Sequence, residues 1–164
     1  MGGVIETIFW FLVVLTPLVF IHEFGHYWFA RRNGVKVEVF SVGFGRELFG
    51  YTDKSGTRWK FSLIPFGGYV KMFGQSDLGP DEDEADLTEA EREVAFHSKK
   101  LSQKAMIVAA GPLANLLFAI VVFTVLFATA GQPFTPATVS EVVPDSAAET
   151  AGIEAGDTFT EVAG

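Results

Sequence analysis

Two histidines four residues apart, His22 and His26, with Glu23 between them, form a pattern that suits metal-assisted hydrolysis. Residues four apart share one face of an α-helix, so both imidazoles can reach one ion. Glu23 lies about 100° around the helix from His22, where its carboxylate can act on water without binding the metal. Zinc lowers the pKa of its water toward about 7, and a carboxylate can then pass the proton to a leaving amine. The pattern predicts Zn²⁺ on the two histidines and Glu23 as catalytic base; the alternative is a polar patch at a helix end.

Composition narrows the kind of protein that carries this motif. The 164 residues are 49% hydrophobic, include no Cys and have a formal net charge of −8. Without Cys, disulfides and Cys-based zinc sites are excluded, so a metal must use His and carboxylates. The acidic balance argues against nucleic acid as a partner, because nucleic-acid binders show a basic stripe.

The motif directly follows an apolar run, Val4–Ile21, and a second apolar run extends over Ala105–Ala130. A helix that crosses a bilayer needs about 20 predominantly apolar residues, so both runs predict transmembrane helices. The rival interpretation of the first run is a secretory signal peptide. No basic residue precedes this run and no small-residue cleavage site follows it, so a retained helix is favoured. We therefore expect a multi-pass membrane protein.

The positive charges predict the orientation of these helices. All 12 Lys and Arg residues lie between Arg31 and Lys104. Cytoplasmic loops are enriched in Lys and Arg, so the middle segment is expected on the cytoplasmic side and both chain ends on the exoplasmic side. In a bacterium this corresponds to the inner (cytoplasmic) membrane.

The segment between the two apolar runs predicts a small β meander. Apolar and polar residues alternate over 35–42, which is typical of a half-buried strand. Segments 48–51 and 57–64 flank Asp53–Gly56, a favourable hairpin turn, and 67–72 predicts a short further strand. An acidic stretch follows, in which Thr88–Glu91 fits a helix capping box. The fold class expected is an α-helical membrane protein with a small, aromatic-rich β region at the membrane interface.

Four motifs in family order resemble the N-terminal portion of bacterial site-2 proteases of the RseP type (regulator of sigma-E): Phe20–His26, Ser41–Gly45, Phe66–Met72 and Ala110–Asn115. Residues 145–157 resemble the start of a PDZ domain. The resemblance implies five parts, namely a first transmembrane helix (4–32), a membrane-associated cytoplasmic β region (33–76), an acidic linker with an amphipathic helix (77–104), a second transmembrane helix (105–130) and a partial PDZ-like domain (131–164).

The resemblance also implies a function, a zinc-dependent intramembrane endopeptidase that cleaves membrane-anchored regulatory proteins such as anti-sigma factors. His22 and His26 are then the zinc ligands and Glu23 the catalytic base. A strand containing Gly67, Gly68, Tyr69 and Val70 is expected to pair with the extended substrate. The expected partners are a transmembrane protein substrate and membrane lipid. The PDZ-like tail is expected to bind peptide or to regulate access.

The sequence departs from the family at the third zinc ligand, an Asp in a Leu-Asp-Gly motif on a later helix, which this chain lacks. Asp157 falls in the outward tail, on the wrong side of the membrane to replace it. Catalytic zinc usually has three protein ligands. We therefore expect an N-terminal fragment, truncated within the PDZ-like region, that binds zinc weakly and is inactive alone.

Other functions remain open at this stage. The alternatives are a PDZ-bearing membrane adaptor and an inactive pseudoprotease, with a metal-ion transporter ranked last. Asn115, a polar residue in the second apolar run, is compatible with helix packing or with support of the active site.

Overall fold

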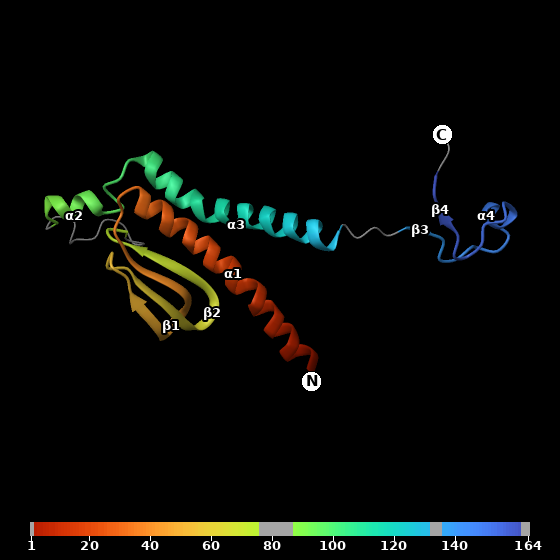
Figure 1. The fold of residues 1–164 in the computed structure, drawn as a ribbon, viewed down its shortest axis with the longest axis horizontal. Coiled ribbons are helices and arrows are strands. Elements are labelled where there is room, and N and C mark those ends of the chain that lie inside the picture. The colour runs from red at the N-terminus through yellow and green to blue at the C-terminus, as the bar shows by residue number, and fades with distance from the viewer. Residues whose placement is uncertain (1, 76–86, 132–135, 162–164) are drawn as a thin grey trace. The chain divides into compact units, whose positions relative to one another are not determined.

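The computed structural model describes residues 2–75, 87–131 and 136–161 (Figure 1). The chain divides into two compact units, Met1–Phe123 and Thr124–Gly164, which are described separately. The elements in chain order are α1 (Gly2–Arg32), β1 (Val37–Thr52), β2 (Arg58–Met72), α2 (Glu89–Val94), α3 (Leu101–Ala130), β3 (Ala137–Thr138), α4 (Ala147–Thr150) and β4 (Thr158–Phe159).

Helices α1 and α3 are each long and apolar enough to cross a membrane, as predicted from their sequences. Large apolar side chains stay exposed along both helices; Trp10 is 57% exposed and Leu117 is 64% exposed. Exposed apolar surface of this extent is typical of contact with lipid rather than with water. Helix α3 begins at Leu101, about one turn before the predicted apolar run, because the polar turn that contains Gln103 is also helical.

Strands β1 and β2 form an antiparallel two-stranded sheet that curls beside α1 (Figure 1). The four strand segments expected from the sequence are joined into two long strands. The chain bends within each strand instead of ending it, at Gly43 (φ 89°) in β1 and at Gly67 (φ 107°) in β2. Glycine adopts this left-handed backbone region without the steric penalty of a Cβ. The small β meander is therefore confirmed, with fewer and longer strands than predicted.

The first part of β1 lies between two segments of β2. Phe40 is opposite both Val70 and Trp59, and Ser41 is opposite both Tyr69 and Lys60. Ser41 and Phe40 are both buried, and the Ser41 hydroxyl lies 3.3 Å from that of Ser62, another buried residue of the curled sheet. The prediction that polar and apolar residues alternate between solvent and core is therefore wrong here.

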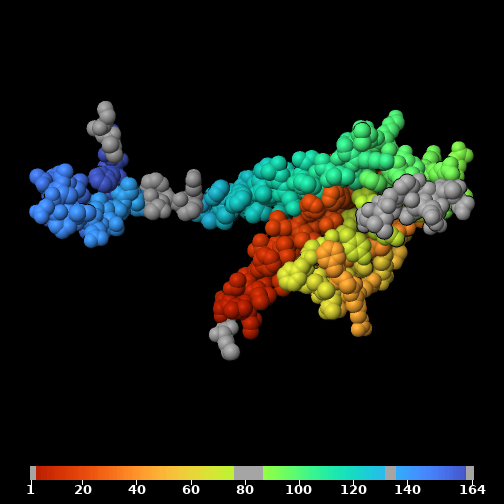
Figure 2. All heavy atoms as spheres, turned by 180° about the vertical axis from the view of Figure 1, so that it is seen from behind, coloured from red at the N-terminus to blue at the C-terminus, as the bar shows by residue number. Residues whose placement is uncertain are grey.

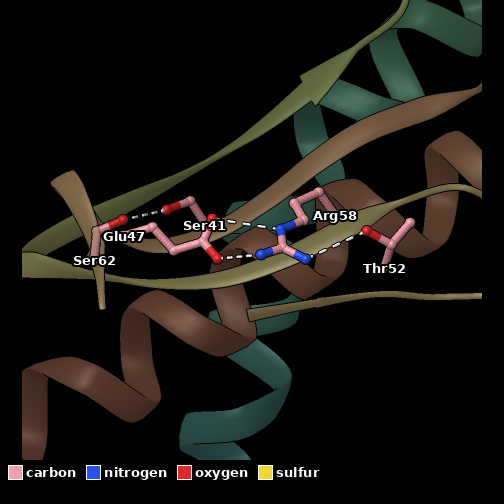
Figure 3. Close-up of polar contacts among 5 residues, drawn as sticks. All are labelled: Ser41, Glu47, Thr52, Arg58 and Ser62. Carbon is pink, nitrogen blue, oxygen red and sulfur yellow. Dashed lines mark hydrogen bonds and ion pairs between the residues drawn. The ribbon is translucent and has the colours of Figure 1, made fainter. Parts of the chain in front are cut away.

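Polar side chains link the curled parts of the sheet (Figure 3). The guanidinium of Arg58 forms an ion pair with the carboxylate of Glu47, and its NH1 group donates to Thr52 Oγ1 at 3.4 Å. The hydroxyls of Ser41 and Ser62 are 3.3 Å apart, and Ser41 Oγ donates to the Gly43 carbonyl at 2.9 Å. The buried hydroxyls therefore have partners, as buried polar groups require.

The predicted hairpin turn at Asp53–Gly56 is confirmed. Asp53 Oδ1 accepts hydrogen bonds from the Ser55 hydroxyl at 2.6 Å and from the Thr57 backbone N–H at 3.0 Å. Asp53 Oδ2 accepts from Trp59 Nε1 at 2.9 Å. These bonds lower the pKa of Asp53 well below its ordinary value, the Ser55 bond most strongly, although partial desolvation opposes them. Hydrogen bonds to the ionised form act in this direction.

Replacing Asp53 by Ala is expected to destabilise the protein by about 1 kcal/mol at neutral pH, since the hydrogen bonds of a partly exposed carboxylate are partly screened. The folded-state pKa lies below the unfolded value of about 3.9, so this stabilisation is fully present above about pH 5 and is lost as the pH falls below about 4. The measurement is thermal unfolding of the detergent-solubilised wild type and Asp53→Ala, followed by Trp fluorescence as the pH is lowered. A stability difference between the wild type and Asp53→Ala that stayed constant down to pH 3 would contradict the lowered pKa of Asp53.

The core of the first unit lies where α1, the sheet and α3 meet. Its buried side chains are Ala30, Val35, Val37, Met72 and Ile107. Seen from the opposite side, the sheet and α3 lie against α1 (Figure 2). The end of α1 that carries the His-Glu-x-x-His motif is thus packed on two sides.

Helix α2 and its flanks attach to the same end of the molecule. The Thr88 backbone N–H and hydroxyl donate to Glu91 Oε2 at 2.9 and 2.6 Å, and the Glu91 N–H donates to Thr88 Oγ1 at 3.4 Å. The predicted capping box is therefore confirmed. The backbone N–H of Phe96 donates to the Phe73 carbonyl at 2.8 Å, which joins this segment to the end of β2. Residues 77–86 of the predicted acidic linker lie outside the described residues.

The second unit contains two short strands, β3 and β4, with the short helix α4 between them in the chain. Strands β3 and β4 are antiparallel, with Ala137 opposite Phe159. The Ser146 hydroxyl accepts from the Glu149 N–H at 3.2 Å and so caps α4. The partial PDZ-like domain expected over residues 131–164 stays a prediction.

Candidate metal centre and substrate cavity

Helix α1 brings the two imidazoles of the motif together. Nε2 of His22 and Nε2 of His26 lie 3.2 Å apart. Two nitrogens that are each about 2.0–2.1 Å from one tetrahedral zinc ion are separated by about 3.3–3.4 Å. The histidine nitrogens therefore face one another at the separation that two ligands of one zinc ion have.

Helix α3 holds both rings from the side remote from this contact. The Nδ1 group of His26 is 2.8 Å from the Ile107 carbonyl oxygen, a distance at which the N–H donates to that oxygen. This bond leaves Nε2 of His26 as the nitrogen with a free lone pair. Nδ1 of His22 is 3.3 Å from the side-chain amide of Asn115. Each ring is thus oriented through Nδ1, which is how metal-binding histidines are commonly held.

Two glycines allow α1 and α3 to approach closely at this point. A Cβ atom on Gly25 would collide with the Ala110 carbonyl oxygen and lie 2.8 Å from Ala114 Cβ. A Cβ atom on Gly111 would collide with Nε2 of His26 and lie 2.9 Å from Nε2 of His22. The space beside the two ligand nitrogens exists because residue 111 has no side chain.

These features fit part of a zinc site. The two Nε2 atoms and the space beside Gly111 supply two ligands and room for an ion. Over the described ranges 2–75, 87–131 and 136–161, no three His, Cys, Asp or Glu side chains gather into a metal-binding group. A third protein ligand, as catalytic zinc usually has, is therefore not among these residues.

A cavity of ≈330 Å³ adjoins the motif. Its walls contain Glu23 and His26 from α1, part of β2 and one turn of α3; the full lining is Glu23, His26, Gly68, Tyr69, Val70, Met72, Gln75, Phe96, Ile107 and Val108. Its volume lies within the range of ligand-binding clefts, roughly 300–1,000 Å³. Glu23 and His26 thus open onto a mostly apolar cavity.

Three of the four residues predicted to bind substrate lie at this cavity. Gly68, Tyr69 and Val70 line it together with Glu23. A Cβ atom on Gly68 would lie 3.0 Å from Glu23 Cγ and 2.6 Å from the Ser41 carbonyl oxygen, so β2 packs directly on α1. Gly67 is not part of the lining and packs against the ring of Phe44.

Sequence reasoning missed the contributions of Gly25, Gly111 and the Ile107 carbonyl. A glycine inside a helix lowers its stability by about 1 kcal/mol relative to Ala, so a glycine in an apolar helix is a signal of close packing. This signal was available at both glycines. A backbone carbonyl carries no such signal, because every residue has one.

Comparison with known proteins identifies the family. Residues 10–161 match the family described as peptidase family M50. The chain is 49% identical over 157 residues to a Rhizobium meliloti protein named as a putative zinc metalloprotease, with 94% of this chain and 42% of that protein covered. A protein of the same description from Mesorhizobium japonicum is 49% identical over 158 residues, covering 94% of this chain and 43% of that protein.

A third relative, from Xylella fastidiosa and again named as a putative zinc metalloprotease, is 47% identical over 164 residues, covering 100% of this chain and 35% of that protein. The chain thus spans 35% to 43% of the length of these relatives. The family resemblance inferred from the motifs is confirmed, and the chain belongs to peptidase family M50.

Proposed function

We propose that this chain forms part of a zinc-dependent endopeptidase that acts within a membrane. The observation that carries the proposal is the pair of imidazoles on an apolar helix, 3.2 Å apart at Nε2. Ionisable residues on membrane helices are functional candidates because they are costly to retain there. The names of the relatives support zinc as the metal.

In this mechanism His22 and His26 hold Zn²⁺ through Nε2, and a further ligand comes from outside the described residues. Zinc, when bound, acts as a Lewis acid toward water and toward the scissile carbonyl. Glu23 accepts a proton from the attacking water as its oxygen bonds to the carbonyl carbon. The same carboxyl then donates that proton to the amine nitrogen as the C–N bond breaks. The carboxylate of Glu23 lies in the wall of the mostly apolar cavity, beside Gly68 of β2.

The substrate proposed is a membrane-anchored regulatory protein of the anti-sigma-factor kind. A transmembrane helix must unwind before its peptide bonds can be hydrolysed, and its freed backbone groups then need partners. Among the described residues, segment 68–72 of β2 pairs with β1 along one edge. An extended substrate added along the other edge would satisfy those groups. Because Gly68 is close to Glu23, a strand bound there would bring its backbone near the base.

The proposal places the protein in the bacterial inner membrane with residues 33–104 cytoplasmic and both chain ends exoplasmic. The charge distribution supports it, since all 12 Lys and Arg residues fall between Arg31, at the end of α1, and Lys104. Exposed aromatic side chains of the sheet, including Phe49 and Tyr51, suit the lipid interface. Residues 131–164, proposed as part of a PDZ-like domain, would bind peptide or regulate access.

The test is cleavage in liposomes by the full-length protein, with a single-span membrane-anchored protein as substrate. Cleavage that a chelator abolishes and added Zn²⁺ restores is expected. A His22→Ala variant is expected to be inactive, whereas a His97→Ala variant, changed at the histidine outside the motif, is expected to cleave normally. A zinc-loaded protein that cleaves no such substrate would instead support an adaptor or a pseudoprotease.

A further inference from the structure

Asn115 is a polar side chain on an otherwise apolar part of α3, and it lies opposite His22. Its Nδ2 atom is 3.3 Å from Nδ1 of His22 on α1. Its other amide atom, Oδ1, is buried and has no hydrogen-bond partner. A buried unsatisfied oxygen costs about 1–3 kcal/mol, so the contact with His22 does not use the amide fully.

The position of the proton on a zinc-binding histidine indicates which amide atom of Asn115 should face His22. A histidine that binds a metal through Nε2 is neutral and carries its proton on Nδ1. Such an Nδ1–H group needs an acceptor, and the amide NH₂ group is only a donor. A half-turn of the Asn115 carboxamide exchanges its two atoms and places Oδ1 against Nδ1 of His22. The ring N–H then has Oδ1 as its acceptor, and the NH₂ group takes the position that Oδ1 held before.

The second histidine shows the same arrangement with a backbone acceptor. The Nδ1–H group of His26 donates to the Ile107 carbonyl oxygen at 2.8 Å. This bond holds the ring of His26 against α3. Asn115 lies two turns further along the same helix. Both rings are therefore oriented by α3 through the nitrogen that does not face the proposed ion.

We propose that Asn115 is a positioning residue that fixes the ring and tautomer of His22, with Nε2 turned toward His26 and Gly111. The inference rests on the proposed zinc site and adds a residue to it that does not touch the metal or the substrate. Partners of this kind raise metal affinity by about 10–100-fold, because they hold the ligand ready to bind.

The test is the zinc affinity of the full-length protein in detergent, measured by competition with a chromogenic chelator. Asn115→Leu, which keeps the size and removes the acceptor, is expected to weaken zinc binding by about 10–100-fold. Asn115→Asp keeps an oxygen that accepts from Nδ1 and is expected to stay close to the wild type. The control is Gln103→Leu, which removes an amide of α3 that donates to Asn33 Oδ1, just after the end of α1, at 3.3 Å. Its zinc affinity is expected to be unchanged.

The outcomes separate this inference from the proposed function. Equal affinities for the wild type and Asn115→Leu, in a protein whose zinc binding requires His22 and His26, would overturn the positioning role alone. Equal weakening by Leu and Asp, with a lower unfolding temperature of the metal-free protein, would also overturn it, because it would indicate a helix-packing role. Zinc binding that persists after loss of both histidines would overturn the zinc site itself.

Discussion

Replacing Glu23 by Gln is expected to lower the rate of substrate cleavage by about 10²–10⁴-fold, the usual contribution of a general base. Gln has the shape of Glu but cannot accept the proton of the attacking water or return it to the amine. Zinc binding is expected to be unchanged, because Glu23 is not assigned as a ligand. The measurement is cleavage in liposomes together with the zinc content of the purified full-length protein.

The matched control is Glu6→Gln, the same substitution on the same helix near its start, which is expected to cleave at the wild-type rate. Two results would oppose the assignment of the base. One is unchanged cleavage by Glu23→Gln, and the other is loss of zinc together with loss of activity, which would make Glu23 a ligand.

Replacing Gly111 by Ala is expected to have the second large effect, on zinc binding itself. The added Cβ would collide with Nε2 of His26 and lie 2.9 Å from Nε2 of His22. Forcing extra volume into a packed site costs about 1–3 kcal/mol, which corresponds to a loss of about 5–150-fold in affinity if it falls on the bound state. The substitution removes no ligand and no polar group. A loss of zinc affinity would therefore show that the ion needs the space beside residue 111. Chelator competition measures the change.

The control is Gly3→Ala, since a Cβ on this helical glycine meets no atom within 4 Å. It is expected to bind zinc as the wild type does. Unchanged zinc affinity in Gly111→Ala would mean that the ion does not occupy the space between α3 and the two histidines.

The parts of the molecule that depend on local chemistry could be predicted from the sequence. The helix spacing of His22 and His26 places both rings on one face wherever the helix forms. The turn at Asp53 and the cap at Thr88 are each built from side chains that bond to backbone only a few residues away. Periodicity and composition likewise predicted α1 and α3, because each is uniformly apolar over a membrane-spanning length.

The parts that depend on contacts between distant segments could not be predicted. Ser41 is buried beside Ser62, which is 21 residues away in the chain, and no local pattern specifies that contact. The bond from His26 to the Ile107 carbonyl depends on the register in which α1 meets α3. Gly25 and Gly111 allow the two helices to approach closely; each glycine signals close packing in the sequence, but which atoms it faces depends on how the helices cross.

The site is therefore shared between two helices. Helix α1 supplies the side chains that we propose to react and to bind zinc, whereas α3 supplies the acceptor for His26, the amide beside His22 and the empty volume at Gly111. Strand β2 closes the cavity beside Glu23. This division explains why a five-residue motif on one helix is not sufficient to define the geometry of the centre.

The most direct test of the central claim is the zinc stoichiometry of the full-length protein and of its His22→Ala, His26→Ala and His97→Ala variants, measured by elemental analysis after dialysis against a weak chelator. The account predicts about one zinc ion per chain in the wild type and in His97→Ala, since each catalytic site holds one ion. It predicts almost none in His22→Ala and His26→Ala. Full zinc content in either of these two variants would contradict it.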